Sequence, residues 1–327
     1  DTVYAQSITV TEEPVPDLRQ RAPFSVSAAQ VRSNLGDIPG EVQETMYVPD
    51  DETFSTLVEK RGSFTGYETL LEQQIGTNGR NVPNRCNFEP VADKRFGGLF
   101  GNSLGREINT VQRGVSWDVS DAYGWCGPDG VPFVVVPLTE QEGVFIITEK
   151  PAGIALYNGQ TGVLEVRPNA DGIPGPSYPL SLAATQREAS AALGGFWDWV
   201  FNRAGWEQPD EADSINSGND SEFVLAGVDG SEYYVTPQSG RGAATAISVF
   251  TVVDANLRGT ELAPLTVHRL VAPAHPVWQS ATAITDRIRA NFGDVFAQQR
   301  ESGIYELAPT GPDTWVATIG TPQNILY

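Results

Sequence analysis

The chain has 327 residues, of which 40% are apolar, so it is long enough to form two globular domains or one large one. Charged residues make up only 19%, while 33 glycines and 23 prolines favour short elements joined by turns over a helical bundle. A net charge of -20 argues against nucleic acid partners and against binding to an anionic membrane surface.

The N-terminal third, residues 1–112, is a mixed region. It starts with "DTVYAQSITVTEE", which predicts extended structure, and two helices are expected further on: 27–34, with Ser27 as N-cap, and "FTGYETLLEQQI". No stretch approaches the roughly 20 apolar residues that a membrane span requires. The chain does not begin with Met, and we expect an export signal or a membrane anchor to precede it, so that any membrane contact is made through a segment outside this sequence.

Two cysteines, Cys86 in "PNRCNF" and Cys126 in "YGWCGPDG", lie in polar segments rich in turn-forming residues, where a buried inert thiol is unexpected. One interpretation is a disulfide, which would indicate an oxidising compartment outside the cytoplasm and would join the N-terminal region to the segment that follows. The other interpretation is two unrelated free thiols.

The segment "GNSLG", residues 101–105, fits the G-x-S-x-G pattern of a nucleophile elbow, with Ser103 as nucleophile and His268 or His275 as base. Its surroundings argue against a hydrolase, because the residues before it are interrupted by glycine and the chain shows runs of strands instead of alternating strands and helices. The competing interpretation is a Gly-rich surface turn. For His268 and His275 it is a pair of solvent-facing residues at strand ends.

A repeated frame is the strongest pattern in the chain. Residues 129–137 read "DGVPFVVVP" and residues 229–237 read "DGSEYYVTP", and each stretch is followed by a β-rich hairpin and a closing strand, "LEVR" or "LTVH". A helix is expected after each closing strand, in "LSLAATQREASAALGGFWDWVF" and in "VWQSATAITDRIRANFGDVFAQQ". The second copy has further strands in "SEFVLAGV", "GIYELAP" and "DTWVATIG".

These elements predict an α+β fold with two related units, 113–205 and 206–327, after the N-terminal region 1–112. Each unit would be an antiparallel sheet that buries one face against its own helix.

Three tryptophans, Trp197, Trp199 and Trp206, cluster in "GFWDWVFNRAGW". One interpretation is an interaction patch, because Trp is enriched at binding hot spots. The other is that these rings cap the core where the two units meet.

The acidic segment 207–222 offers oxygen ligands for Ca²⁺ in Asp210, Asp213, Asn216 and Asp220, although the spacing of a calcium-binding loop is absent and a solvated loop explains it equally. Two histidines and no C-x-x-C argue against a zinc site, and no phosphate-binding signature is present. No cofactor is expected.

The frame carried by Tyr233, Tyr234, Val235, Pro237, Asp254 and Gly259, with Phe133, Val135, Pro137, Asn158 and Gly162 in the first copy, resembles the cystatin-like and PepSY-type units of bacterial envelope membrane proteins. The resemblance covers at most two-thirds of the chain. It implies helix-on-antiparallel-sheet units outside the cytoplasm that bind or regulate without catalysis.

The function that we expect is therefore non-enzymatic: assembly or protein–protein binding in a bacterial membrane complex, through partners or self-assembly. The alternatives are a serine hydrolase acting through Ser103 and a structural protein of a virion or surface layer.

Overall fold

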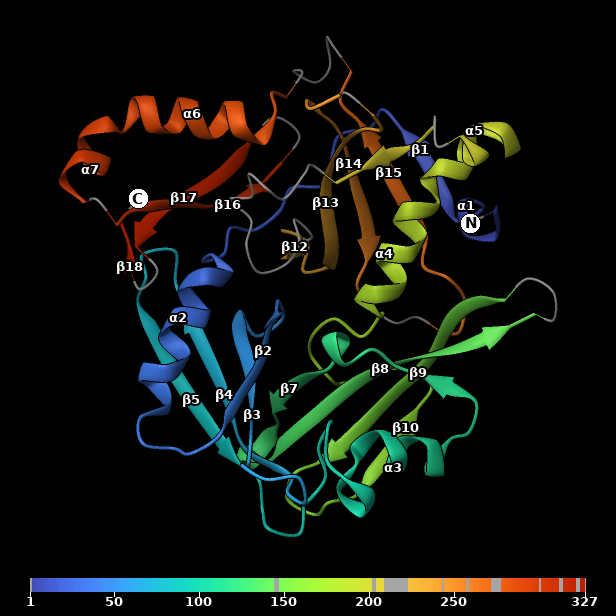
Figure 1. Cartoon of the computed structure of the whole chain (residues 1–327), viewed down its shortest axis with the longest axis vertical. Coiled ribbons are helices and arrows are strands. Elements are labelled where there is room, and N and C mark those ends of the chain that lie inside the picture. Colours follow the sequence, from blue (N-terminus) through green and yellow to red (C-terminus); the bar gives the residue numbers. More distant parts are fainter. Residues whose placement is uncertain are drawn as a thin grey trace.

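Four sheets, each with a helix ahead of it in the chain, make up the described part of the protein (Figure 1). The structure is a computed structural model that describes residues 2–143, 147–201, 204–208, 223–242, 244–256, 259–271, 278–299, 301–311, 314–321 and 324–326. The helices are α1 (Thr2–Ala5), α2 (Phe24–Leu35), α3 (Leu104–Val111), α4 (Leu180–Glu188), α5 (Phe196–Val200), α6 (Ala281–Asn291) and α7 (Gly293–Gln298). The mixed α+β class expected from the sequence is confirmed.

The sheets are numbered here in chain order. Sheet 1 contains β2 (Glu41–Val48), β3 (Thr53–Glu59), β4 (Tyr67–Ile75) and β5 (Asn81–Asn87). Sheet 2 contains β6 (Val115–Ser116), β7 (Tyr123–Cys126), β8 (Pro132–Glu142), β9 (Thr148–Asn158) and β10 (Leu164–Arg167). Sheet 3 contains β1 (Ile8–Thr11), β11 (Trp206–Glu207), β12 (Phe223–Ala226), β13 (Glu232–Gly240), β14 (Ile247–Asp254) and β15 (Leu265–Arg269). Sheet 4 contains β16 (Gly303–Pro309), β17 (Trp315–Thr321) and β18 (Asn324–Ile325).

Sheets 2 and 3 share the same order and register for five successive strands. In each sheet, two short strands pair with a long central strand, β8 or β13, which pairs with β9 or β14 and through it with β10 or β15. The agreement extends to individual rungs, that is, to residues that pair side by side across the central strands. The rung Pro137, Ile154 and Arg167 in sheet 2 corresponds to the rung Pro237, Phe250 and His268 in sheet 3.

Helix α4 packs on the sheet that follows it, and it also contacts the 3-10 turn Val119–Asp121, which lies between β6 and β7 of the preceding sheet. It contacts β15, just as α3 contacts β10 in sheet 2. Two buried polar side chains of α4 hold it there: Gln186 Nε2 donates to the carbonyl oxygen of Ala263 at 2.9 Å, and Arg187 Nη1 donates to Thr236 Oγ1 at 3.1 Å. The boundary expected at 205/206 therefore separates α4 from the sheet that it covers.

The expectation that each unit buries a sheet face against its own helix holds only in part: α6 packs on sheet 3, whereas α4 lies in a central core that several sheets share. Tyr47 and Phe54 of sheet 1, Ile154 of sheet 2 and Tyr234 of sheet 3 belong to one buried cluster together with Leu182 of α4. The outer faces of the sheets have their own cores. Sheet 2 packs there with α3 and side chains from sheet 1, and sheet 3 packs with α6 and sheet 4.

Strand β1 pairs in parallel with β15, so sheet 3 is not purely antiparallel. The extended start expected from the sequence is thus partly confirmed, after the short helix α1. The pairing brings the N-terminal end of the chain beside α4 and α5 (Figure 1).

Two local expectations for the N-terminal region need correction. "YETLLEQQI" forms strand β4 instead of a helix, because β3 and β5 pair with it on both sides and most of its side chains are buried. Ser27 lies inside α2 instead of capping it. Its buried hydroxyl accepts a hydrogen bond from Gln73 Nε2 at 3.0 Å, a contact across to β4 that no local pattern indicates.

Two links join the sheets. Cys86 of β5 and Cys126 of β7 form a disulfide between sheets 1 and 2, with their Cα atoms 6.0 Å apart, which confirms the predicted bridge. The second link connects sheet 4 to the segment that leads into α2. A bulge in β16 lies at Glu306, and the buried carboxylate of Glu306 accepts hydrogen bonds from Arg21 Nη1 at 2.8 Å and from the backbone N–H of Phe24, the first residue of α2, at 2.6 Å.

Within the residues described, no helix has the length and apolarity of a membrane span.

Candidate functional site

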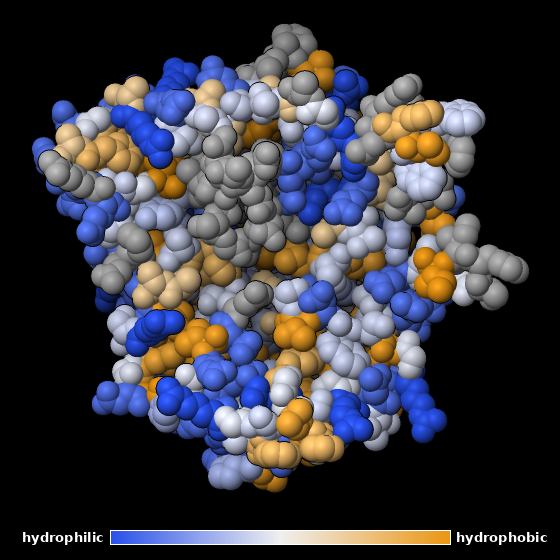
Figure 2. All heavy atoms as spheres, viewed as in Figure 1, coloured by the Kyte–Doolittle hydropathy of each residue, from blue (hydrophilic) through white to orange (hydrophobic). Residues whose placement is uncertain are grey.

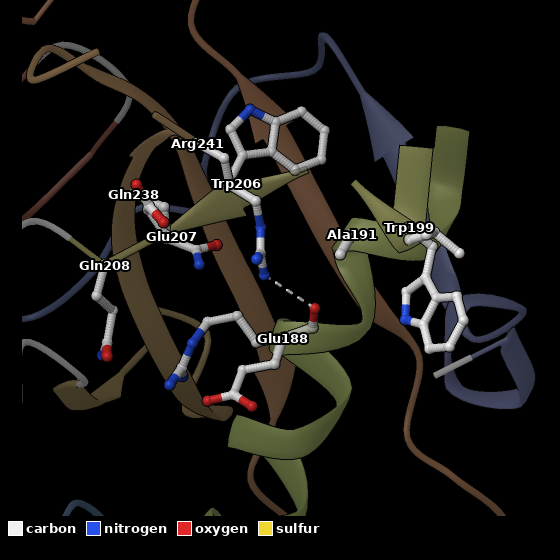
Figure 3. A pocket seen from close by; sticks show the side chains of 10 residues that line it. Glu188, Ala191, Trp199, Trp206, Glu207, Gln208, Gln238 and Arg241 are labelled. Atoms are coloured by element: carbon white, nitrogen blue, oxygen red, sulfur yellow. Dashed lines mark hydrogen bonds between the residues drawn. The ribbon is translucent and has the colours of Figure 1, made fainter. Parts of the chain in front are cut away.

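A hollow of about 670 Å³ opens between the C-terminal end of α4, helix α5 and one end of sheet 3 (Figure 3). Its lining comes from three places. Arg187 and Glu188 end α4, Trp199 and Val200 belong to α5, and β11 and β13 with the residues just after them supply Trp206, Glu207, Gln208, Gln238 and Arg241. Strand β11 lies at the end of β13 because Trp206 and Glu207 pair with Gly240 and Ser239.

Buried polar side chains form part of this lining. Arg187 is 6% exposed and Gln238 is 2% exposed. Thr236 accepts a hydrogen bond from Arg187, and Gln238 Oε1 accepts one from the hydroxyl of Thr251 on the neighbouring strand. Because burial of a polar group costs free energy unless it is bonded, these contacts fix both side chains in place beside the hollow.

The wall that carries Trp206 is held against the segment that follows α4. The backbone N–H of Trp206 donates to Ser190 Oγ at 3.2 Å, and this hydroxyl donates to the Trp206 carbonyl oxygen at 3.3 Å. Gly205 has a φ of 84°, and a Cβ there would lie 2.6 Å from the backbone of Ser190. Only glycine permits this approach without strain.

Arg241 closes another side of the hollow. Its Nη2 donates to the carbonyl oxygen of Glu188 at 3.2 Å, drawn as a dashed line in Figure 3. The carboxylate of Glu207 accepts from the backbone N–H of Gly242 at 3.1 Å. Backbone groups therefore orient two of the four charged side chains of the lining, Arg241 and Glu207.

The lining combines two guanidinium groups, two carboxylates, two carboxamides and two indole rings. Among its described residues none is a serine, cysteine or histidine, the usual nucleophiles and bases. The side chains supply hydrogen bonding and aromatic contact, which suit binding, and the carboxylates of Glu188 and Glu207 are groups of the kind that transfer protons.

The three predicted tryptophans are divided between two surfaces. Trp199 and Trp206 line the hollow, on different sides of it in Figure 3. Trp197 is 69% exposed and stacks on Phe201, with ring centroids 6.1 Å apart. The core-capping interpretation is wrong for Trp197 and for Trp199, which is 40% exposed, while Trp206 packs partly buried against the central core.

Ser103 is the N-cap of α3, where its hydroxyl accepts a hydrogen bond from the backbone N–H of Arg106 at 3.3 Å. Its φ of -83° is ordinary, whereas a nucleophile elbow is a strained turn between a strand and a helix. A 3-10 turn, Phe100–Asn102, precedes it instead of a strand. α3 and β15 lie at opposite ends of the molecule in Figure 1, so Ser103 and His268 are not brought together.

His268 is 7% exposed, so the expectation of a solvent-facing residue is wrong. It lies within β15, between β14 and β1, and its Nδ1 is 3.0 Å from the carbonyl oxygen of Glu13. His268 is buried because β1 pairs with β15, which would otherwise be the edge strand of sheet 3. His275 lies outside the described residues.

The predicted calcium ligands Asp210, Asp213, Asn216 and Asp220 also lie outside the described residues. Within the described ranges, no three His, Cys, Asp or Glu side chains are grouped so that they could hold a metal ion.

Sequence reasoning missed Arg187, Gln238 and Arg241. For Arg187 the sequence offered one signal, its neighbour Gln186, which is a polar residue within the apolar face of a predicted helix. Gln186 marks the turn of α4 that contacts the segment leading into β15 of sheet 3. For Gln238 the signal was its position one residue after the repeated frame, on the same side of β13 as Tyr234 and Thr236. Nothing in the sequence singled out Arg241.

Comparisons of this chain with protein-family models, with curated proteins and with solved structures find no match.

Proposed function

We propose that this chain is a non-enzymatic binding scaffold from outside the bacterial cytoplasm, built from related helix-and-sheet units. The observation that carries the proposal is the shared strand order and register of sheets 2 and 3, including the proline-centred rungs. Two unrelated sheets have no physical reason to agree rung by rung, whereas copies of one unit do. The units would begin with the helix, so that α3 precedes sheet 2 and α4 precedes sheet 3.

The resemblance to cystatin-like and PepSY-type units fits this arrangement, because those units also consist of a helix that covers an antiparallel sheet. The disulfide between Cys86 and Cys126 supports a location outside the cytoplasm, because such bonds persist in oxidising compartments. The role of Ser103 as a helix cap supports a function without catalysis.

The surface proposed for protein contact is the outward side of α5. Trp197 and Phe201 are 69% and 55% exposed, and their rings stack on each other. Figure 2 shows apolar side chains projecting at the upper right, where Figure 1 places α5. Exposed aromatic rings on a short helix are typical of binding surfaces, where Trp supplies large contact areas.

The test is site-specific photo-crosslinking in the cell that makes the protein. We expect Trp197→p-benzoylphenylalanine to give one discrete adduct, either with a partner protein or with a second copy. The control position is Phe64, which is 64% exposed but lies in the loop between β3 and β4 of sheet 1. The proposed contact is rejected if position 197 gives no adduct, or if position 64 gives the same one.

A fluorophosphonate probe tests the absence of catalysis. We expect no labelling that depends on Ser103. Labelling of the wild type that disappears in Ser103→Ala would instead support the serine hydrolase.

A further inference from the structure

We propose that the hollow between α4, α5 and sheet 3 is a binding site for a neutral saccharide. This goes beyond the proposed scaffold function, because the hollow and the outward side of α5 are different surfaces. Trp199 faces the first and Trp197 belongs to the second. The site has the size of a small-molecule pocket, since such sites measure about 300–1,000 Å³.

The charges of the lining favour a ligand without net charge. Arg187 and Arg241 are balanced by Glu188 and Glu207. An anionic ligand would meet the two carboxylates and a cationic ligand would meet the two guanidinium groups, and like charges brought together in a pocket oppose binding. A neutral ligand meets neither penalty.

The polar groups also favour a ligand with many hydroxyls. Guanidinium and carboxamide groups are planar and can bond two neighbouring oxygens at once, and the carboxylates accept hydrogen bonds. A sugar hydroxyl both donates and accepts, so adjacent hydroxyls can use donors and acceptors from the same lining. Gln238 is well suited to this role, because Thr251 already fixes the orientation of its buried amide.

The two indole rings supply the apolar part of the site. The face of an indole carries negative charge density, so it attracts the weakly positive C–H groups on one side of a pyranose ring. Trp206 is held by Ser190, which limits the ordering that binding requires. Trp199 lines the hollow and is 40% exposed, so its ring is open to contact from solvent.

The test uses the full 327-residue chain and measures its binding of maltotriose, cellotriose and triacetylchitotriose by saturation-transfer NMR and by calorimetry. Trigalacturonate and trialanine serve as an anionic and a peptide probe. We expect saturable binding of at least one neutral trisaccharide and no comparable binding of the two other probes.

Three variants locate the site. Trp199→Ala should weaken binding of that trisaccharide by about 10-fold or more, as removal of an aromatic anchor does. Arg241→Gln, which keeps most of the side-chain volume, should weaken it similarly. Trp197→Ala is the matched control, two residues from Trp199 in the same helix, and should change affinity by less than about two-fold.

Thermal unfolding of each variant shows whether the fold is intact, and a variant that unfolds early is replaced by Trp206→Phe, which keeps an aromatic ring. Four results would overturn the proposal: no saturable binding of any neutral trisaccharide, preferential binding of trigalacturonate, preferential binding of trialanine, or equal loss of affinity in Trp197→Ala and Trp199→Ala. Crosslinking at position 197 does not depend on these results, so the scaffold and the saccharide site can fail separately.

Discussion

Glu232 is a buried acid in unfavourable surroundings. It is fully buried, and its Oε1 accepts a hydrogen bond from the backbone N–H of Asp50 at 3.1 Å, while its Oε2 has no hydrogen-bond partner among the described residues. Burial is the main cause that raises the pKa of Glu232 to about 8, and the carboxylates of Asp50, Asp254 and Asp51 raise it further. Glu232 is therefore protonated at neutral pH, where sheet 1 meets sheet 3.

This pKa has a defined consequence for stability. Because folding raises the pKa of Glu232, this residue contributes its full stabilisation at pH values below the pKa of the unfolded state. That stabilisation is lost as the pH rises through about 8, the pKa of Glu232 in the folded state. We expect the free energy of unfolding to fall by up to roughly 3–5 kcal/mol between about pH 5 and about pH 9 from this group.

The substitution Glu232→Gln keeps the shape and cannot ionise, so it should flatten that pH dependence and make the protein more stable than wild type at pH 9. Urea unfolding at several pH values measures it. Glu165→Gln, an exposed position on β10, is the control and should leave the profile unchanged. An unchanged slope in Glu232→Gln would show that Glu232 is ionised in the folded protein.

At the scale of elements, the sequence predicted strands far better than it predicted what they pack against. The alternation and turn residues around Tyr234 and Tyr157 identified β13 and β9, because each strand can be read locally. β4 was mistaken for a helix because its sequence, YETLLEQQI, is rich in the helix formers Leu, Glu and Gln, and because burial on both faces leaves no clear alternation of apolar and polar residues. The partner of α4 was not predictable, because it depends on the return of the chain in β15.

Gly205 tests the close contact between the start of β11 and the segment that follows α4. Gly205→Ala should destabilise the protein by about 2 kcal/mol or more, since it combines a positive φ with a clash against Ser190. Gly172→Ala is the matched control: φ there is 76°, but a Cβ would meet nothing within 4 Å, so only the backbone cost of about 1 kcal/mol applies. Equal losses for the two variants in denaturant titrations would mean that the contact with Ser190 is loose.

For the whole molecule, the sequence predicted the disulfide and the repeated frame, but not the hollow. Cys86 and Cys126 were a single pair with one way to join. The hollow is lined from α4, α5 and the strands of sheet 3, so its residues come together only when these elements meet. Trp199 and Trp206 were found because aromatic rings are conspicuous in a sequence, whereas Arg187 resembles any other arginine of a helix.

The disulfide should contribute to global stability. It closes a segment in which the two cysteines are separated by 40 positions, which corresponds to about 4 kcal/mol on the chain-entropy model. The double variant Cys86→Ala with Cys126→Ala should lose about that much in urea unfolding, and reduced wild type should behave alike. A loss below about 1 kcal/mol would show that contacts between sheets 1 and 2, such as Leu70 against Gly124, suffice alone.

The parallel pair β1 and β15 imposes an order on folding. Glu13 and His268, which meet beside this pair, are 255 positions apart in the chain, so β1 cannot dock until synthesis has passed β15. Contacts between such distant segments form slowly. Until they form, the outer hydrogen-bonding groups of β15 are open to other chains, and the nascent protein passes through a stage that is vulnerable to intermolecular strand pairing.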